Sequence, residues 1–147
     1  MDTEVEFRPL RVLRTFSVSK REDTPNEDRH CVSADEMICA VSDGASVSFD
    51  SGPWAEIIAR RFVENPDISR DWIAAAVEEY RKAYDRDSMS WAYQAAFDRG
   101  SFATLLGVVC SPEGRGVKVA SFGDSLLAFV ERAGPGNLHR TLSGVSA

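Results

Sequence analysis

Two short apolar segments separated by a polar connection constrain the fold of this chain most. Residues 29–33 (RHCVS) and 37–42 (MICAVS) flank Ala34, Asp35 and Glu36. Two strands with so short a connection form an antiparallel hairpin. The connection lacks the Asn-Gly or Asp-Gly pair of the commonest tight turns, so the sequence does not define the turn type. The hairpin nevertheless requires an antiparallel sheet.

The expected pairing of this hairpin brings two carboxylates together. With the turn centred between Asp35 and Glu36, Asp28 lies opposite Asp43 at the open end of the hairpin. Directly paired residues have Cβ atoms about 4.5–5.5 Å apart. Two carboxylates about 4 Å apart repel each other by about 1 kcal/mol in water and by about 4 kcal/mol at an effective dielectric constant of about 20. A bound cation or a shared proton relieves this repulsion, whereas a register slip of one residue turns one side chain to the other face.

The middle of the chain favours helices. Residues 53–64 suit a helix with proline at its first position, Ser51 or Gly52 as its cap, and an end at the following Asn-Pro pair. A second helix is expected over about residues 69–84 and a short third one over residues 91–97. The second helix carries apolar residues at four-residue intervals, namely Trp72, Ala76, Tyr80 and Tyr84. Such a stripe is typical of a core-facing side and less often of a binding surface.

The remaining apolar segments favour strands. FATLLGVVC is apolar throughout, as expected for a strand covered on both faces, whereas VKVASF alternates. LLAFVE and the start of RTLSGVSA are also strand-like, and residues 5–18 suit an edge strand because they contain Pro9. SPEGRG and GPGN separate these segments as turns. The order of strands, helices and strands predicts a single α+β domain over residues 1–147, with helices packed on antiparallel sheets.

Acidic residues follow two of the expected strands. Gly44 comes directly after Asp43 and permits a sharp turn and the close approach of a carbonyl to a ligand. Asp124 stands in a Gly-Asp-Ser turn; if SPEGRG closes a hairpin, Asp124 returns to the same end of the sheet, where Glu27 adds a fourth carboxylate. Such oxygens suit magnesium or manganese, and two such ions activate water and hold a phosphate for attack. The alternative is that both motifs are ordinary turn residues.

Composition narrows the class of protein. The net charge of -6 argues against a general nucleic-acid-binding protein. No apolar run approaches the roughly 20 residues needed to cross a bilayer. Cys31, Cys39 and Cys110 have no metal-binding spacing and are expected as free thiols in a reducing compartment. We therefore expect a cytoplasmic protein that binds neither nucleic acid nor membrane.

Four segments of the chain, in their order and spacing, resemble the PPM-type (type-2C) metal-dependent serine/threonine protein phosphatases. These segments are NEDRHCV, ICAVSDGA, SFATLLGVV and VASFGDSLLAFV. The stretch SDGASVSFDSGPWAEIIA is similar to the bacterial branch, whose metal motif reads Asp-Gly-Ala. The resemblance implies a four-layer α-β-β-α sandwich of two antiparallel sheets flanked by helices. It also implies a centre of two magnesium or manganese ions, with a third in some relatives.

The resemblance also implies roles for individual residues. Asp28 and Asp43 would be the catalytic metal ligands, with Glu27 beside Asp28 as a partner within the metal group. The carbonyl of Gly44 would hold one ion, and Asp124 would bind a further metal. The nucleophile would be a metal-bridging water, so no phosphoenzyme is expected.

Two departures from the family pattern affect the expected activity. Asp23 stands where relatives carry a phosphate-binding arginine, so Arg21 or Lys20 would bind the phosphate, unless both are solvated loop charges. The resemblance covers residues 15–132 but matches only the first part of a typical catalytic domain, which implies a sandwich that is incomplete at its C-terminus and has exposed sheet edges.

Three functions are consistent with these patterns. The first is a metal-dependent phosphatase of phosphoserine and phosphothreonine proteins, or its N-terminal part. The second is a catalytically weak phosphatase-like module that binds a partner, or a second copy of itself, through its sheet edges. The third is an unrelated metal-binding α+β domain.

Overall fold

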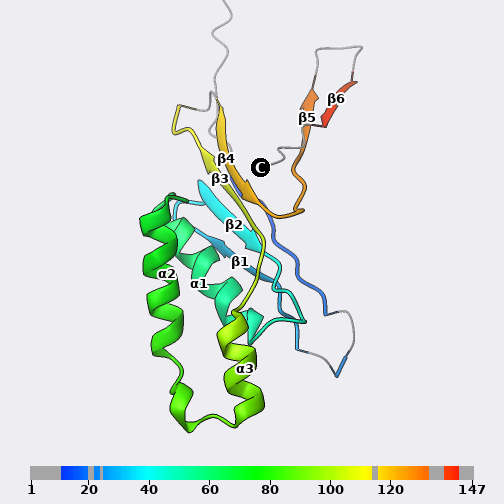
Figure 1. Cartoon of the computed structure of the whole chain (residues 1–147). Coiled ribbons are helices and arrows are strands. Elements are labelled where there is room, and N and C mark those ends of the chain that lie inside the picture. The colour runs from blue at the N-terminus through cyan, green and yellow to red at the C-terminus, as the bar shows by residue number, and fades with distance from the viewer. Residues whose placement is uncertain (1–10, 20–21, 24, 114–115, 133–137, 143–147) are drawn as a thin grey trace, which may run out of the picture.

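The chain forms one four-stranded antiparallel sheet packed against three helices, and a separate two-stranded sheet, within the residues described (Figure 1). The computed structural model describes residues 11–19, 22–23, 25–113, 116–132 and 138–142. The larger sheet contains, in spatial order, β1 (Arg29–Val32), β2 (Ile38–Ser42), β3 (Leu105–Cys110) and β4 (Val117–Phe122). The helical elements are α1 (Ser51–Glu64), α2 (Arg70–Lys82), the 3₁₀ turn η1 (Arg86–Ser88) and α3 (Trp91–Arg99), and the smaller sheet pairs β5 (Ala128–Arg132) with β6 (Leu138–Leu142). The predicted α+β class is confirmed.

The hairpin of β1 and β2 has the predicted register. Arg29 pairs with Ser42, and Cys31 pairs with Ala40. One position further along, the same register brings Asp28 opposite Asp43. β3 then pairs antiparallel with β2, and the predicted hairpin of β3 and β4 completes the sheet.

In the first hairpin turn, hydrogen bonds to side chains hold the backbone in place of an Asn-Gly pair. Glu36 adopts a left-handed φ of 61°. The Ser33 hydroxyl accepts a hydrogen bond from the Ile38 amide at 2.9 Å, and Asp35 Oδ1 accepts one from the Met37 amide at 3.1 Å. The connection therefore closes without glycine, because local side-chain bonds hold the backbone.

Helix α1 covers one face of the sheet. Its buried apolar residues are Ala55, Ile58, Ala59 and Phe62. Phe62 lies against Gly107 of β3, where an added Cβ would come within 2.2 Å of the ring. Trp72 and Ala76 of α2 join the same core together with Leu105.

The start of α1 differs from the prediction. Asp50, rather than Ser51 or Gly52, is the capping residue, with a left-handed φ of 40° and no side-chain cap bond. The Ser51 hydroxyl instead donates to Glu27 at 2.9 Å. Gly52 makes room for Arg29, whose Nη2 would lie 2.9 Å from an added Cβ. Ser51 and Gly52 therefore contact Glu27 and Arg29 and do not cap the helix.

The second and third helices lie where they were predicted. Ser69 caps α2 by accepting a hydrogen bond from the Trp72 amide at 3.3 Å. The stripe residues Trp72, Ala76 and Tyr80 are buried, which confirms their assignment to the core, whereas Tyr84 lies beyond the end of α2 and is half-buried. No residue of α3 is buried. This helix is attached through rings, among them Phe97, whose centroid lies 5.3 Å from that of Phe49.

The predicted edge strand over residues 5–18 is wrong in its described part. Residues 11–19 form no strand, and the Val12 amide donates instead to the Glu36 carbonyl, in the hairpin turn, at 3.0 Å. Leu13, Phe16 and Val18 are at least 80% exposed, so their side chains are not part of the core. Residues 5–10, with Pro9, lie outside the described residues. Among the residues that the structure describes, β1 is therefore an edge of the four-stranded sheet.

The structure also bears on two predictions made from composition, which concern the cysteines and membrane-spanning segments. Cys31, Cys39 and Cys110 are free thiols, as predicted. Burial raises the pKa of the Cys39 thiol, and the neighbouring Cys110 adds to this effect. None of the helices in the described part of the chain is long and apolar enough to cross a membrane.

Candidate metal centre

Asp28 and Asp43 lie at the open end of the hairpin formed by β1 and β2. They are the next residues beyond the paired Arg29 and Ser42. Both aspartates line a hollow of about 40 Å³, and both also line a larger cavity of about 250 Å³. The two carboxylate residues thus share the walls of the same cavities, as the predicted register requires.

Arg29 holds the loop that carries Asp28. The Asp28 amide donates to Asn26 Oδ1 at 3.0 Å, which closes a local side-chain turn. Arg29 Nη1 donates to the carbonyls of Asn26 and Asp28 at 2.6 and 2.9 Å. Its Nε lies 3.2 Å from a carboxylate oxygen of Glu56 in α1. The arginine therefore links this loop to the helix that covers the sheet.

Thr104 holds the backbone of Asp43. The Asp43 amide donates to Thr104 Oγ1 at 3.1 Å, and the Thr104 amide donates to the Asp43 carbonyl at 2.9 Å. The Ser42 hydroxyl donates to the Thr104 carbonyl at 2.6 Å. Thr104 Oγ1 also lies 3.0 Å from the hydroxyl of Ser125, which lines the larger cavity. Sequence reasoning did not single out Thr104, although the residue lies within the segment SFATLLGVV.

Glu27 and Gly44 pack tightly behind the two aspartates. Gly44 forms an isolated β-bridge with Ala103, and an added Cβ would lie 3.0 Å from the Glu27 carbonyl oxygen and from both oxygens of Ser51. Glu27 Oε1 accepts the Ser51 hydroxyl at 2.9 Å, and its Oε2 accepts the hydroxyl of Ser46. Both oxygens of Glu27 are thus occupied by serines of the loop and helix that follow Asp43.

Contrary to the prediction, Asp124 does not form a metal-binding group with Asp28 and Asp43. It is exposed in the bend after β4, whereas its neighbour Ser125 lines the larger cavity. Gly123 turns the chain here with a φ of 102° and packs so closely that an added Cβ would lie 2.6 Å from Thr104 Cγ2. Within the described residues, no group of three or more His, Cys, Asp or Glu side chains is arranged to hold a metal ion. The predicted cluster of three carboxylates is therefore not formed there.

Basic residues near the site come from β1 in the described part of the chain. Lys20 and Arg21, the predicted phosphate ligands, lie outside the described residues. Arg29 and His30 line the larger cavity together with the two aspartates. Sequence reasoning missed both, although their position directly after Asp28 is a signal that the hairpin register could have supplied.

The donor set of Asp28 and Asp43 fits a largely hydrated hard cation. Magnesium retains several waters in proteins and is often held by only one or two carboxylates. The hollow of about 40 Å³ exceeds the roughly 10–15 Å³ that one water molecule requires. The two carboxylates would also relieve their mutual repulsion by sharing such an ion.

Comparisons with known proteins leave the function to be argued from these residues alone. No protein-family model, no curated protein and no solved structure matches this chain.

Proposed function

We propose that this chain is a metal-dependent phosphatase domain, or part of one, that hydrolyses phosphoserine and phosphothreonine in protein substrates. The observation that carries the proposal is that Asp28 and Asp43 directly follow the paired Arg29 and Ser42 at the open end of the hairpin and line the same two cavities. Magnesium or manganese, when bound, would supply an activated water and neutralise phosphate charge. The resemblance to PPM-type phosphatases gives the same two aspartates this role.

The chain's own residues would hold the ion and position the phosphate. Asp28 and Asp43 would be the carboxylate ligands, and Gly44 lines the same hollow. His30 lines the larger cavity beside them and offers a hydrogen-bonding group for a phosphate. Thr104 and Arg29 would fix the ligand backbone, which reduces the reorganisation needed on binding.

We further propose that the fold is the four-layer sandwich of the resemblance. Strand alternation puts Val41, Val108 and Val119 on the sheet face opposite α1, and Val41 and Val119 are 43% and 38% exposed. Exposed apolar residues on one face of a sheet suit packing by a second sheet at about 10 Å. This apolar face supports the sandwich.

Manganese-dependent hydrolysis of p-nitrophenyl phosphate and of a phosphothreonine peptide tests the proposed activity. Asp28→Ala and Asp43→Ala should each abolish the manganese-dependent rate, because each removes a ligand. Asp87→Ala is the matched control, because that carboxylate is 96% exposed and lines neither cavity. Equal rates in all four proteins would refute the phosphatase assignment.

A phosphatase-like binding module is the second candidate. The lack of a three-residue metal group within the described part of the chain favours it, as do the two edge strands β1 and β4. Unpaired edges offer backbone groups to a partner or to a second copy of this chain. Light scattering over a concentration series tests self-association, and a monomer at every concentration would exclude pairing between copies.

A further inference from the structure

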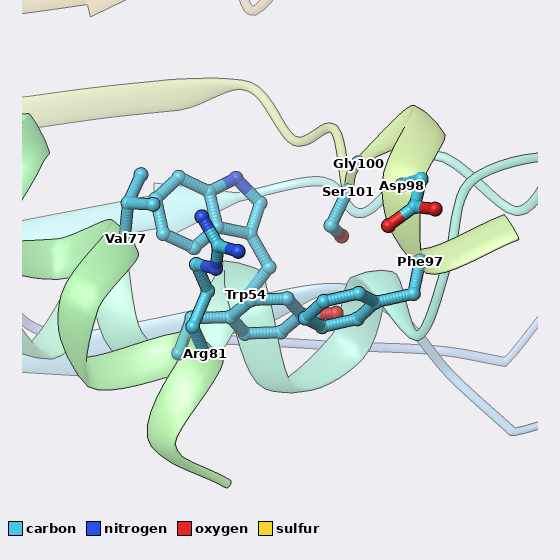
Figure 2. A pocket seen from close by; sticks show the side chains of 8 residues that line it. Trp54, Val77, Arg81, Phe97, Asp98, Gly100 and Ser101 are labelled. Carbon is cyan, nitrogen blue, oxygen red and sulfur yellow. The ribbon is translucent and has the colours of Figure 1, made fainter. Parts of the chain in front are cut away.

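A further cavity lies between the helices and shares no lining residue with the two cavities at the aspartates. Its volume is about 280 Å³, and its walls come from α1, α2, α3 and the residues after α3 (Figure 2). Trp54, Val77 and Arg81 lie on one side of the view, and Phe97, Asp98 and Ser101 lie on the other. The proposed phosphatase chemistry makes no use of this cavity.

Aromatic rings give this cavity flat, apolar walls. The ring centroids of Trp54 and Tyr80 are 5.6 Å apart, with their planes at 72°. The ring of Phe97 enters from α3. Tyr80 is fixed in place because its hydroxyl donates to the Phe49 carbonyl at 2.8 Å. Burial also raises the pKa of Tyr80 above its ordinary value.

Arg81 and Ser101 are two hydrogen-bond donors that line the cavity. The Arg81 guanidinium lies 5.8 Å from the ring centroid of Phe97, and its charge also attracts Asp98, the carboxylate of this cavity. Asp98 accepts hydrogen bonds from Arg86 Nε at 2.8 Å and Nη2 at 2.5 Å. The Ser101 hydroxyl is buried near that of Tyr80 but has no hydrogen-bond partner of normal geometry among the described residues. A guanidinium and a serine hydroxyl are suitable donors for a carboxylate.

We propose that this cavity binds a small aromatic carboxylate, with its ring between Trp54 and Phe97 and its carboxylate at Arg81 and Ser101. The volume is near the lower limit of about 300 Å³ for small-molecule sites, so it suits a single ring rather than a nucleotide. Because α3 has no buried residue, such a ligand would tie α3 to α1 and α2. Binding requires no metal ion.

Benzoate is the probe, and the whole chain is titrated with it in the presence of EDTA. We expect saturable NMR shifts at the amides of Gly100 and Ser101 and at the indole N–H of Trp54. Benzamide has a similar size but no charge, so it should bind about tenfold more weakly or worse. The α3 amides should also become better protected from hydrogen exchange when benzoate is bound.

Two arginine variants of α2 separate a specific site from a general charge effect. Arg81→Gln should weaken benzoate binding by about tenfold or more. Arg70→Gln removes the same charge from the exposed start of the same helix and should leave binding unchanged. An absence of saturable shifts, equal binding of benzamide, or equal affinities of the two variants would overturn the proposed site. These outcomes are independent of phosphatase activity, because Asp43→Ala should bind benzoate as the unmodified chain does.

Discussion

Asp43 and Thr104 are joined by two hydrogen bonds that run in opposite directions. The Asp43 amide donates to the Thr104 hydroxyl at 3.1 Å, and the Thr104 amide donates to the Asp43 carbonyl at 2.9 Å. The second residue comes directly before β3, so the pair connects the loop after β2 to the start of the neighbouring strand. The backbone of a proposed metal ligand is thus fixed independently of any ion.

Thr104→Val should destabilise the chain, because valine keeps the shape of threonine but offers no acceptor to the Asp43 amide. We expect the free energy of unfolding to fall by about 0.5–1.5 kcal/mol, because this hydrogen bond is exposed. Urea unfolding followed by circular dichroism measures this change. Thr104→Ser keeps the hydroxyl and should lose less than half as much. Equal losses in the two variants would show that the hydroxyl acceptor of Thr104 is not the source of the stabilisation.

Gly107→Ala should also destabilise the fold, because its Cβ would lie 2.2 Å from the Phe62 ring. Overpacking of this kind costs about 1–3 kcal/mol. Thermal and urea unfolding would measure it. Gly116→Ala is the matched control, because nothing lies within 4 Å of an added Cβ there. The close approach of α1 to β3 would be contradicted if both alanine variants unfolded at the same urea concentration.

Glu27→Ala should weaken manganese binding at the proposed centre. The Glu27 carboxylate accepts hydrogen bonds from the hydroxyls of Ser46 and Ser51, so its effect on the metal would be indirect. Loss of a group that orients metal ligands typically reduces metal affinity about 10–100-fold. Calorimetric titration with manganese chloride measures the affinity. Glu113→Ala, at an exposed position after β3, should bind as the unmodified chain does. An unchanged affinity in Glu27→Ala would remove Glu27 from the site.

The ion pair between Arg86 and Asp98 should appear in a pH titration. Hydrogen bonds from Arg86 lower the pKa of Asp98 below its ordinary value. A lowered native pKa stabilises the folded state above the ordinary pKa of about 3.9, and this contribution is lost as the pH falls through the folded pKa. Carbon NMR of the Asp98 carboxyl should give a low midpoint that rises in Arg86→Gln and stays low in Arg70→Gln. A midpoint insensitive to Arg86→Gln would argue against the pair in solution.

Much of the fold follows from local patterns. The register of the first hairpin could be predicted because a short connection and alternating side chains permit few pairings. The face of α2 could be predicted from the four-residue spacing of Trp72, Ala76 and Tyr80. The start of α1 could not, because Asp50 is held in its left-handed conformation by α2: the Tyr80 hydroxyl donates to the Asp50 carbonyl at 3.1 Å. Such long-range bonds leave no local signal.

The candidate site was predictable where it depends on one hairpin and not where it depends on several strands. Asp28 and Asp43 follow from the register of β1 with β2. The positions of Thr104 and Ser125 depend on how β3 and β4 join that hairpin. Gly123, in a left-handed conformation, turns the chain so that Ser125 rather than Asp124 lines the cavity. A Gly-Asp-Ser motif alone does not specify this turn.

The contact between Phe62 and Gly107 has a consequence at the opposite end of α1. This helix has 14 residues and therefore extends about 20 Å. Phe62 lies near the last turn and packs against Gly107 of β3, so α1 cannot rotate about its own axis without a collision there. This contact therefore sets the rotational orientation of the whole helix. Ser51, in the first turn, consequently meets the Glu27 carboxylate from a fixed direction. A packing contact between two apolar surfaces thus determines the alignment of a polar loop a full helix length away.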